Sequence, residues 1–302
     1  MLKKIFQFLF WLFLIVGTIY YAFLNFKNYN PQFQQISKSF LTQIEEVKSE
    51  IKNLREKIEK EIVPPIPEVK REIIAPKPLV KVEKEKIEGF LTKEGIIEET
   101  NVQREKHGLL PLKENEILNS TAKMKLEDII EKQYFSHYSP EGEGIGDLMG
   151  KTNYEYIVVG ENLAMGNFEN DKEVVEGWME SHSHRENILN TRYQEIGVAV
   201  KQGIFQGKKV WIAVQHFGKP LSACKKPSEE MKSQIEKNIA QLKEMEEKLK
   251  SLKEEAEKTK DPQKIQEYNL LVSEYNSLLK ETLSMIEEYN FDVKKFNECI
   301  EK

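Results

Sequence analysis

The sequence predicts an α+β globular domain that is preceded by a transmembrane helix and a coiled-coil stalk and followed by an antiparallel helical hairpin. Three observations predict this organisation. An uncharged run of 20 residues lies near the N-terminus, both helix-like and strand-like periods occur in the middle of the chain, and a glycine-free segment rich in Glu, Lys and Leu follows. The 302 residues suffice for about two domains.

Residues 1–26 are predicted to form a membrane anchor. Lys3 and Lys4 precede an uncharged run from Ile5 to Leu24, and a helix of that length spans about 30 Å, the hydrocarbon thickness of a bilayer. The alternative is a cleaved signal peptide, but its apolar region is shorter and ends in small residues. Because lysines favour the inside, we expect a single-pass protein of the cell membrane with its C-terminal bulk outside the cytoplasm.

Residues 33–63 are predicted to form a coiled-coil stalk. Apolar residues recur there at alternating spacings of four and three, at Phe40, Ile44, Val47, Ile51, Leu54 and Ile58. Charged residues flank this narrow seam, as a coiled coil requires. We expect self-association through residues 40–58, as a parallel dimer or a trimer. The alternative is an amphipathic helix that packs on another part of the same chain.

Residues 64–86 are predicted to be a proline-rich spacer. Val63 is followed by Pro64 and Pro65, and further prolines stand at 67, 76 and 78. Proline lacks the amide hydrogen and clashes with the preceding helical turn, so the stalk helix must end here. A proline-rich segment of this kind is semi-rigid, and it would hold the next domain away from the membrane.

Residues 87–220 are predicted to form the globular domain. Helix-like spacing relates Leu118, Ala122, Leu126, Ile129 and Ile130. Strand-like alternation occurs in the segments 196–200 and 210–214, with Gly203 and Gly207 between them. This pair of segments predicts a β-hairpin.

Residues 226–300 are predicted to form the helical hairpin. Apolar residues repeat at three and four on both sides of Asp261 and Pro262, where proline breaks the run. Cys224 and Cys299 lie at equal sequence distances on either side of this break. We therefore expect a Cys224–Cys299 disulfide at the open end of the hairpin, as an oxidising outer compartment permits. Free or intermolecular thiols are the alternative.

Five motifs occur in a fixed order within the globular domain. They are Tyr134-Phe135-Ser136-His137 with Ser139-Pro140, Gly160-Glu161-Asn162-Leu163-Ala164, the stretch from Trp178 to Asn190, Glu195-Ile196-Gly197-Val198, and Gln215-His216-Phe217-Gly218. Together they resemble the CAP superfamily of cysteine-rich secretory, antigen 5 and pathogenesis-related 1 proteins, in its bacterial, SCP-domain form. The resemblance covers about 130 residues and implies an α-β-α sandwich whose sheet is antiparallel.

The resemblance also implies a binding cleft, which contains His137, His184 and Glu161. The second glutamate of the family's cleft corresponds by position to Ser181, one residue after Glu180. One residue turns a helical side chain by about 100°, so Glu180 is the weakest member of the set. The alternatives are that Glu161 and His137 serve only the fold. His216 is expected not to be a ligand.

Two neutral imidazoles suit zinc, and a carboxylate beside them suits a general base or a partner of the bound water. Since two protein ligands are fewer than the usual three, we expect at most a weak, exchangeable zinc site at His137 and His184. Glu161 is the candidate general base, and no other cofactor is expected.

Three functions fit these features. The first is a non-enzymatic binding module for an unknown envelope or extracellular ligand, such as a lipid, a wall component or a peptide, and the resemblance favours it over an enzyme. The second is a metal-dependent hydrolase of the cell envelope, and the third is a structural or docking protein acting through its coiled-coil segments. The net charge of −5 gives no broad basic surface for nucleic acid.

Overall fold

The computed structural model describes residues 68–81 and 89–301. The predicted anchor (1–26) and stalk (33–63) lie outside these residues, and so does the segment 40–58 through which self-association is expected. Within the two described ranges, no helix combines the length and the apolar character that a membrane span requires.

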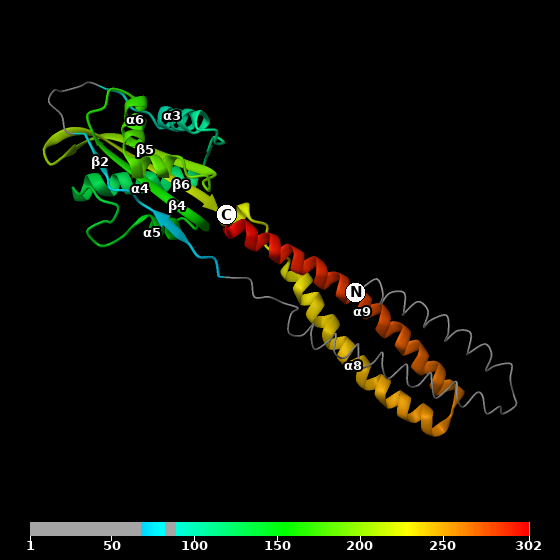
Figure 1. Cartoon of the computed structure of the whole chain (residues 1–302). Coiled ribbons are helices and arrows are strands. Elements are labelled where there is room, and N and C mark those ends of the chain that lie inside the picture. The colour runs from blue at the N-terminus through cyan, green and yellow to red at the C-terminus, as the bar shows by residue number, and fades with distance from the viewer. Residues whose placement is uncertain (1–67, 82–88, 302) are drawn as a thin grey trace. The chain divides into compact units, whose positions relative to one another are not determined.

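A mixed sheet of six strands lies at the centre of the globular domain (Figure 1). The strand order is β1-β4-β6-β5-β3, and β2 also pairs with β4. The strands are β1 (Glu72–Ile74), β2 (Leu79–Val80), β3 (Lys113–Glu114), β4 (Tyr156–Gly166), β5 (Glu195–Phe205) and β6 (Lys208–Pro220).

The expected antiparallel sheet is correct for the long central strands and wrong at the edges. β4, β6 and β5 are antiparallel neighbours, whereas β1 and β2 run parallel to β4, and β3 runs parallel to β5. Parallel neighbours need a long crossover connection. The helices between β2 and β4, and between β3 and β5, provide it.

The predicted hairpin of segments 196–200 and 210–214 is confirmed as β5 and β6. Only Gln206 and Gly207 connect the two strands, and their φ angles are +48° and +78°. Two consecutive positive φ angles match the right-handed twist of the flanking strands. Glycine at the second position makes this turn accessible.

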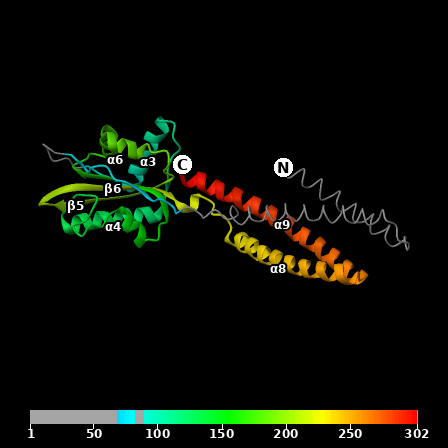
Figure 2. The same cartoon turned by 60° about the horizontal axis from the view of Figure 1, so that its bottom comes forward.

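Helices cover both faces of the sheet. Figures 1 and 2 place α3 (Lys93–Lys106) and α6 (Asp171–Glu180) on one face, and α4 (Glu116–Lys132) on the other. Alternation along β4 supplies both cores, because Val158 and Ala164 pack on the α3–α6 side while Leu163 packs on the α4 side. The predicted α-β-α sandwich is therefore confirmed.

Close packing of α4 on the sheet depends on Gly197 in β5. A Cβ atom at this position would lie 2.2 Å from the backbone carbon of Leu118 and 2.3 Å from the backbone nitrogen of Asn119. Those distances are far below van der Waals contact, so any larger residue would push α4 away from the sheet.

The segment 64–86 is not only a spacer, which corrects the prediction for this region. Its residues 72–74 and 79–80 are β1 and β2, and both pair with the edge of β4 that faces away from β6. We call residues 72–81 the strap. The prolines predicted a spacer, but Pro76 and Pro78 fall in the gap between β1 and β2, where no ladder hydrogen bond is required.

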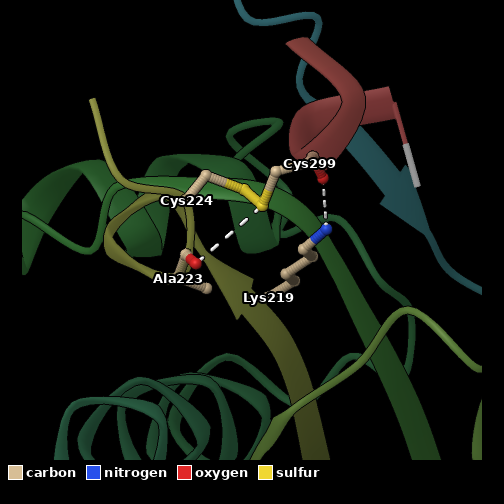
Figure 3. The surroundings of a disulfide bond; sticks show 4 residues. All are labelled: Lys219, Ala223, Cys224 and Cys299. Atoms are coloured by element: carbon tan, nitrogen blue, oxygen red, sulfur yellow. Dashed lines mark hydrogen bonds between the residues drawn. A yellow bond between two sulfur atoms is a disulfide. The ribbon is translucent and has the colours of Figure 1, made fainter. Parts of the chain in front are cut away.

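The helical hairpin and its disulfide are confirmed. α8 (Glu229–Thr259) and α9 (Pro262–Glu301) are separated by two residues, and they pack against each other. Cys224 and Cys299 are bonded, with their Cα atoms 5.7 Å apart (Figure 3). Lys219, near the end of β6, donates a 2.6 Å hydrogen bond to the carbonyl of Cys299, so the last turn of α9 is also tied to the sheet.

Candidate functional site

Glu161 lies in the middle of β4, and its side chain has no exposed surface. Nδ1 of His137 lies 2.5 Å from its Oε1, and Nε2 of His216 lies 2.9 Å from its Oε2. Burial raises the pKa of the Glu161 carboxyl, but the hydrogen bonds from His137 and His216 outweigh it and hold the pKa at about 2. Glu161 is therefore ionised at neutral pH, and each of its oxygens accepts from one imidazole.

His216 was expected not to be a ligand, and the sequence did not place it beside Glu161. It stands directly opposite Glu161 in the register of β4 and β6 and is fully buried. Its Nδ1 shares a 2.9 Å hydrogen bond with the hydroxyl of Thr121 on α4. His216 thus connects the carboxylate to the helix, and its role is to hold Glu161 rather than to face a ligand.

His137 lies in the loop between α4 and α5 (Ile145–Lys151), with 12% of its side chain exposed. Lys125 fixes this loop by donating a 2.8 Å hydrogen bond to the carbonyl of His137. The ring's Nε2 donates to the carbonyl of Pro76 in the strap. Both ring nitrogens therefore face oxygen acceptors and act as donors in this arrangement.

His184 is on α7 (His182–Ile188), with only 2% of its surface exposed. Its Nδ1 shares a 2.8 Å hydrogen bond with Oγ of Ser181, and its Nε2 is buried without a partner. Burial and, second, the charge of His137 lower the pKa of His184 to about 4. The ring is therefore neutral at pH 7 and has one free nitrogen, which donates or accepts according to the tautomer.

Buried amides position α7 against β4. The side-chain amide of Asn187 donates to Oδ1 of Asn162 at 2.9 Å and accepts from the hydroxyl of Tyr193 at 2.7 Å. Gly160 makes this approach possible, since a Cβ there would lie 2.1 Å from the Tyr193 hydroxyl oxygen. The Gly160-Glu161-Asn162 motif thus serves both faces of the sheet: Glu161 holds His137 on one, and Asn162 holds the helix that carries His184 on the other.

The structure does not bring Glu180 together with the three other predicted residues. Glu180 is the exposed last residue of α6, whereas Ser181 directly after it contacts His184. His182 is also peripheral, because 87% of its side chain is exposed. The one-residue offset from the family pattern therefore places a hydroxyl, not a carboxylate, beside His184.

The two-histidine zinc site does not fit the arrangement just described. His137 carries hydrogens on both nitrogens and has no lone pair to give, which leaves only Nε2 of His184 as a free imidazole nitrogen. Within the part of the chain that the structure describes, no three His, Cys, Asp or Glu side chains are grouped to hold a metal ion. Zinc at His137 would require the Pro76 carbonyl to leave.

Comparisons with known proteins identify this part of the chain. The model of the CAP family, described as the cysteine-rich secretory protein family, matches residues 97–217. The protein YkwD of Bacillus subtilis is 39% identical over 116 residues, which cover 38% of this chain and 43% of YkwD. The membrane protein YlbC of the same organism is 36% identical over 105 residues, which cover 35% of this chain and 30% of YlbC. The matches thus span less than half of either relative.

Solved structures also resemble this chain. An extracellular protein containing a SCP domain from Bacillus anthracis is 28% identical, covers 42% of this chain and 40% of its own, and has a TM-score of 0.37. An outer surface protein from Borrelia burgdorferi is 25% identical, covers 42% of this chain and 91% of its own, and also has a TM-score of 0.37. The assignment rests on the family model and on the similarity to YkwD and YlbC. Residues 97–217 of this chain are a CAP-superfamily domain of the bacterial type.

Proposed function

We propose that the CAP domain is a non-enzymatic binding module for a ligand of the cell envelope or the extracellular space, such as a lipid, a wall component or a peptide. The observation that carries this proposal is the state of the two imidazoles. His137 presents an N–H to a carbonyl oxygen, and His184 keeps a buried nitrogen without a partner. Buried polar atoms are almost always hydrogen-bonded, so the free nitrogen of His184 marks a place for a ligand atom.

The low pKa values of the groups in the site support binding rather than general-base catalysis. An effective general base has a pKa near the working pH. The pKa of Glu161 is held at about 2, and both of its oxygens accept hydrogen bonds from imidazoles. The pKa of His184 is lowered to about 4. Neither group is a strong proton acceptor at pH 7 in this arrangement.

We further propose that the module acts at the outer side of the cell membrane. The uncharged run from Ile5 to Leu24 supports this location. The disulfide between Cys224 and Cys299 is consistent with an oxidising compartment. The relative YlbC is described as a membrane protein, and its match covers 35% of this chain.

The metal-dependent hydrolase remains the second candidate, and the free Nε2 of His184 is the observation that favours it. It requires the strap to release His137, so that both rings can offer a lone pair. Calorimetric titration of the full-length chain with zinc tests this candidate. Binding of one zinc per chain that is abolished in the His137→Ala, His184→Ala double variant would support it, and equal heats for both proteins would exclude it.

The structural alternative assigns the function to the helices α8 and α9. Deletion of residues 228–299 would then abolish function, and substitution of the two histidines would have no effect. The proposed binding module predicts the reverse: substitution of the two histidines abolishes function, whereas deletion of residues 228–299 does not.

A binding panel tests the proposal directly. The full-length chain in detergent is presented with purified cell-wall sacculi, anionic phospholipid vesicles and an immobilised library of extended peptides. We expect one probe to bind, with at least about tenfold weaker binding by the His137→Ala, His184→Ala variant, since two hydrogen bonds are lost. His182→Ala is the matched control, because His182 neighbours His184 but is exposed. Binding that is equal in all three proteins would contradict the proposal.

A further inference from the structure

The strap pairs with β4 in two separate pieces. Residues 72–74 pair with 158–160, and residues 79–80 pair with 164–165. Between them, four strap residues pass three residues of β4, beginning with Glu161. Pro76 and Pro78 lie in this interval and have no amide hydrogen to donate. The ladder is therefore interrupted directly beside the candidate site.

Pro76 is the anchor of the interrupted stretch. It is buried, whereas its neighbours Ala75 and Lys77 are exposed. Its carbonyl oxygen accepts a hydrogen bond from Nε2 of His137, and this bond satisfies the Nε2 donor. A segment of the chain itself thus occupies the position at which a ligand carbonyl would meet His137.

The two ends of the strap are held by ion pairs of opposite polarity. Glu72 pairs with Arg192 at the start, and Lys81 pairs with Glu173 at the end. Arg192 lies near one end of this edge and Glu173 near the other. An extended chain with an acid at one end and a base at the other can therefore pair with both in only one direction. Only a chain that runs parallel to β4, with an acid first and a base last, matches both.

Apolar contacts fix the register between these ends. Ile74 and Leu79 pack, partly buried, against the main core cluster on the α3–α6 side. Leu79 also reaches α6, where a Cβ at Gly177 would lie 3.1 Å from its Cδ2 atom. The edge therefore accepts a pattern of acid, aliphatic residue, proline, aliphatic residue and base.

The strap is held by few strong contacts. The two strands comprise three and two residues, and Ile73 and Val80 remain 45% and 50% exposed. The ion pairs at both ends are solvent-accessible, and such pairs contribute little to stability. Short edge strands of this kind exchange more readily than central ones.

We propose that the edge of β4 is a strand-accepting site for an extended polypeptide, and that the strap is its built-in, displaceable occupant. The ligand adds parallel to β4, places a proline carbonyl on His137, and is recognised at its ends by Arg192 and Glu173. Backbone hydrogen bonds to an open sheet edge supply the affinity, and the side-chain pattern supplies the specificity. This inference rests on the proposed binding function and names the class of ligand for the same site.

The strap competes with such a ligand because it is tethered. A tethered segment acts at an effective concentration in the millimolar range. A free peptide with the sequence of the strap should therefore bind the intact chain weakly and a chain with a released strap well. Weakening the strap should raise the affinity for the peptide without any change in β4.

A labelled peptide of residues 71–81 is the probe, and fluorescence anisotropy is the measurement. We expect the full-length Ile74→Asp, Leu79→Asp variant to bind this peptide at least about tenfold more tightly than the unchanged protein. Adding His137→Ala should weaken that binding by roughly two- to tenfold, the range for one hydrogen bond, while adding His182→Ala should not. A peptide with the acid and the base exchanged, Glu72→Lys and Lys81→Glu, should bind less tightly than the native peptide.

Amide hydrogen exchange over residues 156–166 shows whether the strap has been released. Faster exchange in this segment without tighter peptide binding would overturn the proposal. Unchanged exchange would also overturn it, because the strap would then not be displaceable. If the aspartate variant loses its cooperative melting transition, the milder Glu72→Ala, Lys81→Ala variant repeats the test by removing only the exposed ion pairs. If the peptide fails to bind but a panel probe still binds through His137 and His184, the binding function stands and only the strand-accepting site is wrong.

Discussion

Nε2 of His137 donates a hydrogen bond to the carbonyl of Pro76, a residue 61 positions earlier in the chain. This contact joins the loop after α4 to the strap that covers the edge of β4. The other ring nitrogen of His137 faces the ionised Glu161, so both ring nitrogens are hydrogen-bonded. The hydrogen bonding of the candidate site thus depends on a segment that precedes the CAP domain in sequence.

Removal of the buried carboxylate should destabilise the domain strongly. Glu161→Ala leaves His137 and His216 without their shared acceptor, and breaking a buried pair of this kind reduces the free energy of unfolding by about 3–5 kcal/mol. Urea unfolding followed by tryptophan fluorescence measures the loss. Glu180→Ala is the matched control, since Glu180 is exposed and its removal should change stability by less than about 0.5 kcal/mol. Equal effects of the two substitutions would contradict the assigned role of Glu161.

Stability should fall as the pH is lowered through two windows. The pKa of His184 is about 4 in the fold and 6.5 as the ordinary value. Between these pH values the unfolded chain binds a proton at His184 that the folded chain does not, so folding becomes less favourable as the pH falls. The pKa of Glu161 is about 2, against an ordinary 4.5, so the stability that its carboxylate provides is present above pH 4.5 and is lost as the pH falls toward 2.

Substitution of His184 should remove the upper window. In His184→Gln, the free energy of unfolding should change less between pH 6.5 and pH 4 than in the unchanged protein, by an amount on the order of 3 kcal/mol. Urea titrations at a series of pH values provide the comparison. His182→Gln should retain the original slope, because that ring is exposed. An unchanged slope in the His184 variant would show that His184 is not buried in its neutral form.

Two glycine substitutions should differ in their effect on stability. Gly197→Ala places a Cβ within 2.2 Å of the α4 backbone, and overpacking of this kind reduces the free energy of unfolding by about 1–3 kcal/mol or more. Gly150→Ala, in α5, meets no atom within 4 Å and should be neutral or slightly stabilising, since alanine favours the helix. Thermal melting of both variants separates the two outcomes, and similar melting temperatures would contradict the close packing of α4 on β5.

Reduction of the disulfide should loosen the end of α9. The bond joins residues 75 positions apart, and the chain-entropy model gives roughly 4.5 kcal/mol for a loop of that size. In a Cys224→Ser, Cys299→Ser variant, the hydrogen bond from Lys219 to the carbonyl of residue 299 can still form, but amide exchange should accelerate in the last turns of α9. Unchanged exchange there would show that packing alone holds the hairpin closed.

The sequence predicted the parts of the fold that repeat a clear pattern. The break at Pro262 and the equal spacing of Cys224 and Cys299 were enough to predict the hairpin and its disulfide. Proline and a covalent bond each constrain the chain locally and strongly. Alternation in the segments 196–200 and 210–214 sufficed for β5 and β6. The motifs indicated Glu161, His137 and His184 as candidate site residues, but only the structure gives the contacts of their side chains.

The strap could not be predicted from its own sequence. Its two strands are too short for an alternating pattern, and prolines at 76 and 78 favour a spacer. Only the tertiary pairing with β4 makes these residues strands. His216 was missed for a different reason: a single histidine in an apolar strand does not reveal its partner, and the register that places it opposite Glu161 depends on the pairing of β4 with β6.

Side-chain nitrogen NMR of the histidines tests the strand-accepting site at the edge of β4, because the chain contains only five histidines. The Ile74→Asp, Leu79→Asp variant, labelled with ¹⁵N-histidine and assigned by single substitutions, is titrated with the peptide of residues 71–81. If an extended peptide binds at the edge of β4, the resonances of His137 should shift at saturation, while those of His107 and His182 stay in place. Binding that leaves His137 unshifted, or that shifts His107 and His182 as much as His137, would contradict the strand-accepting site.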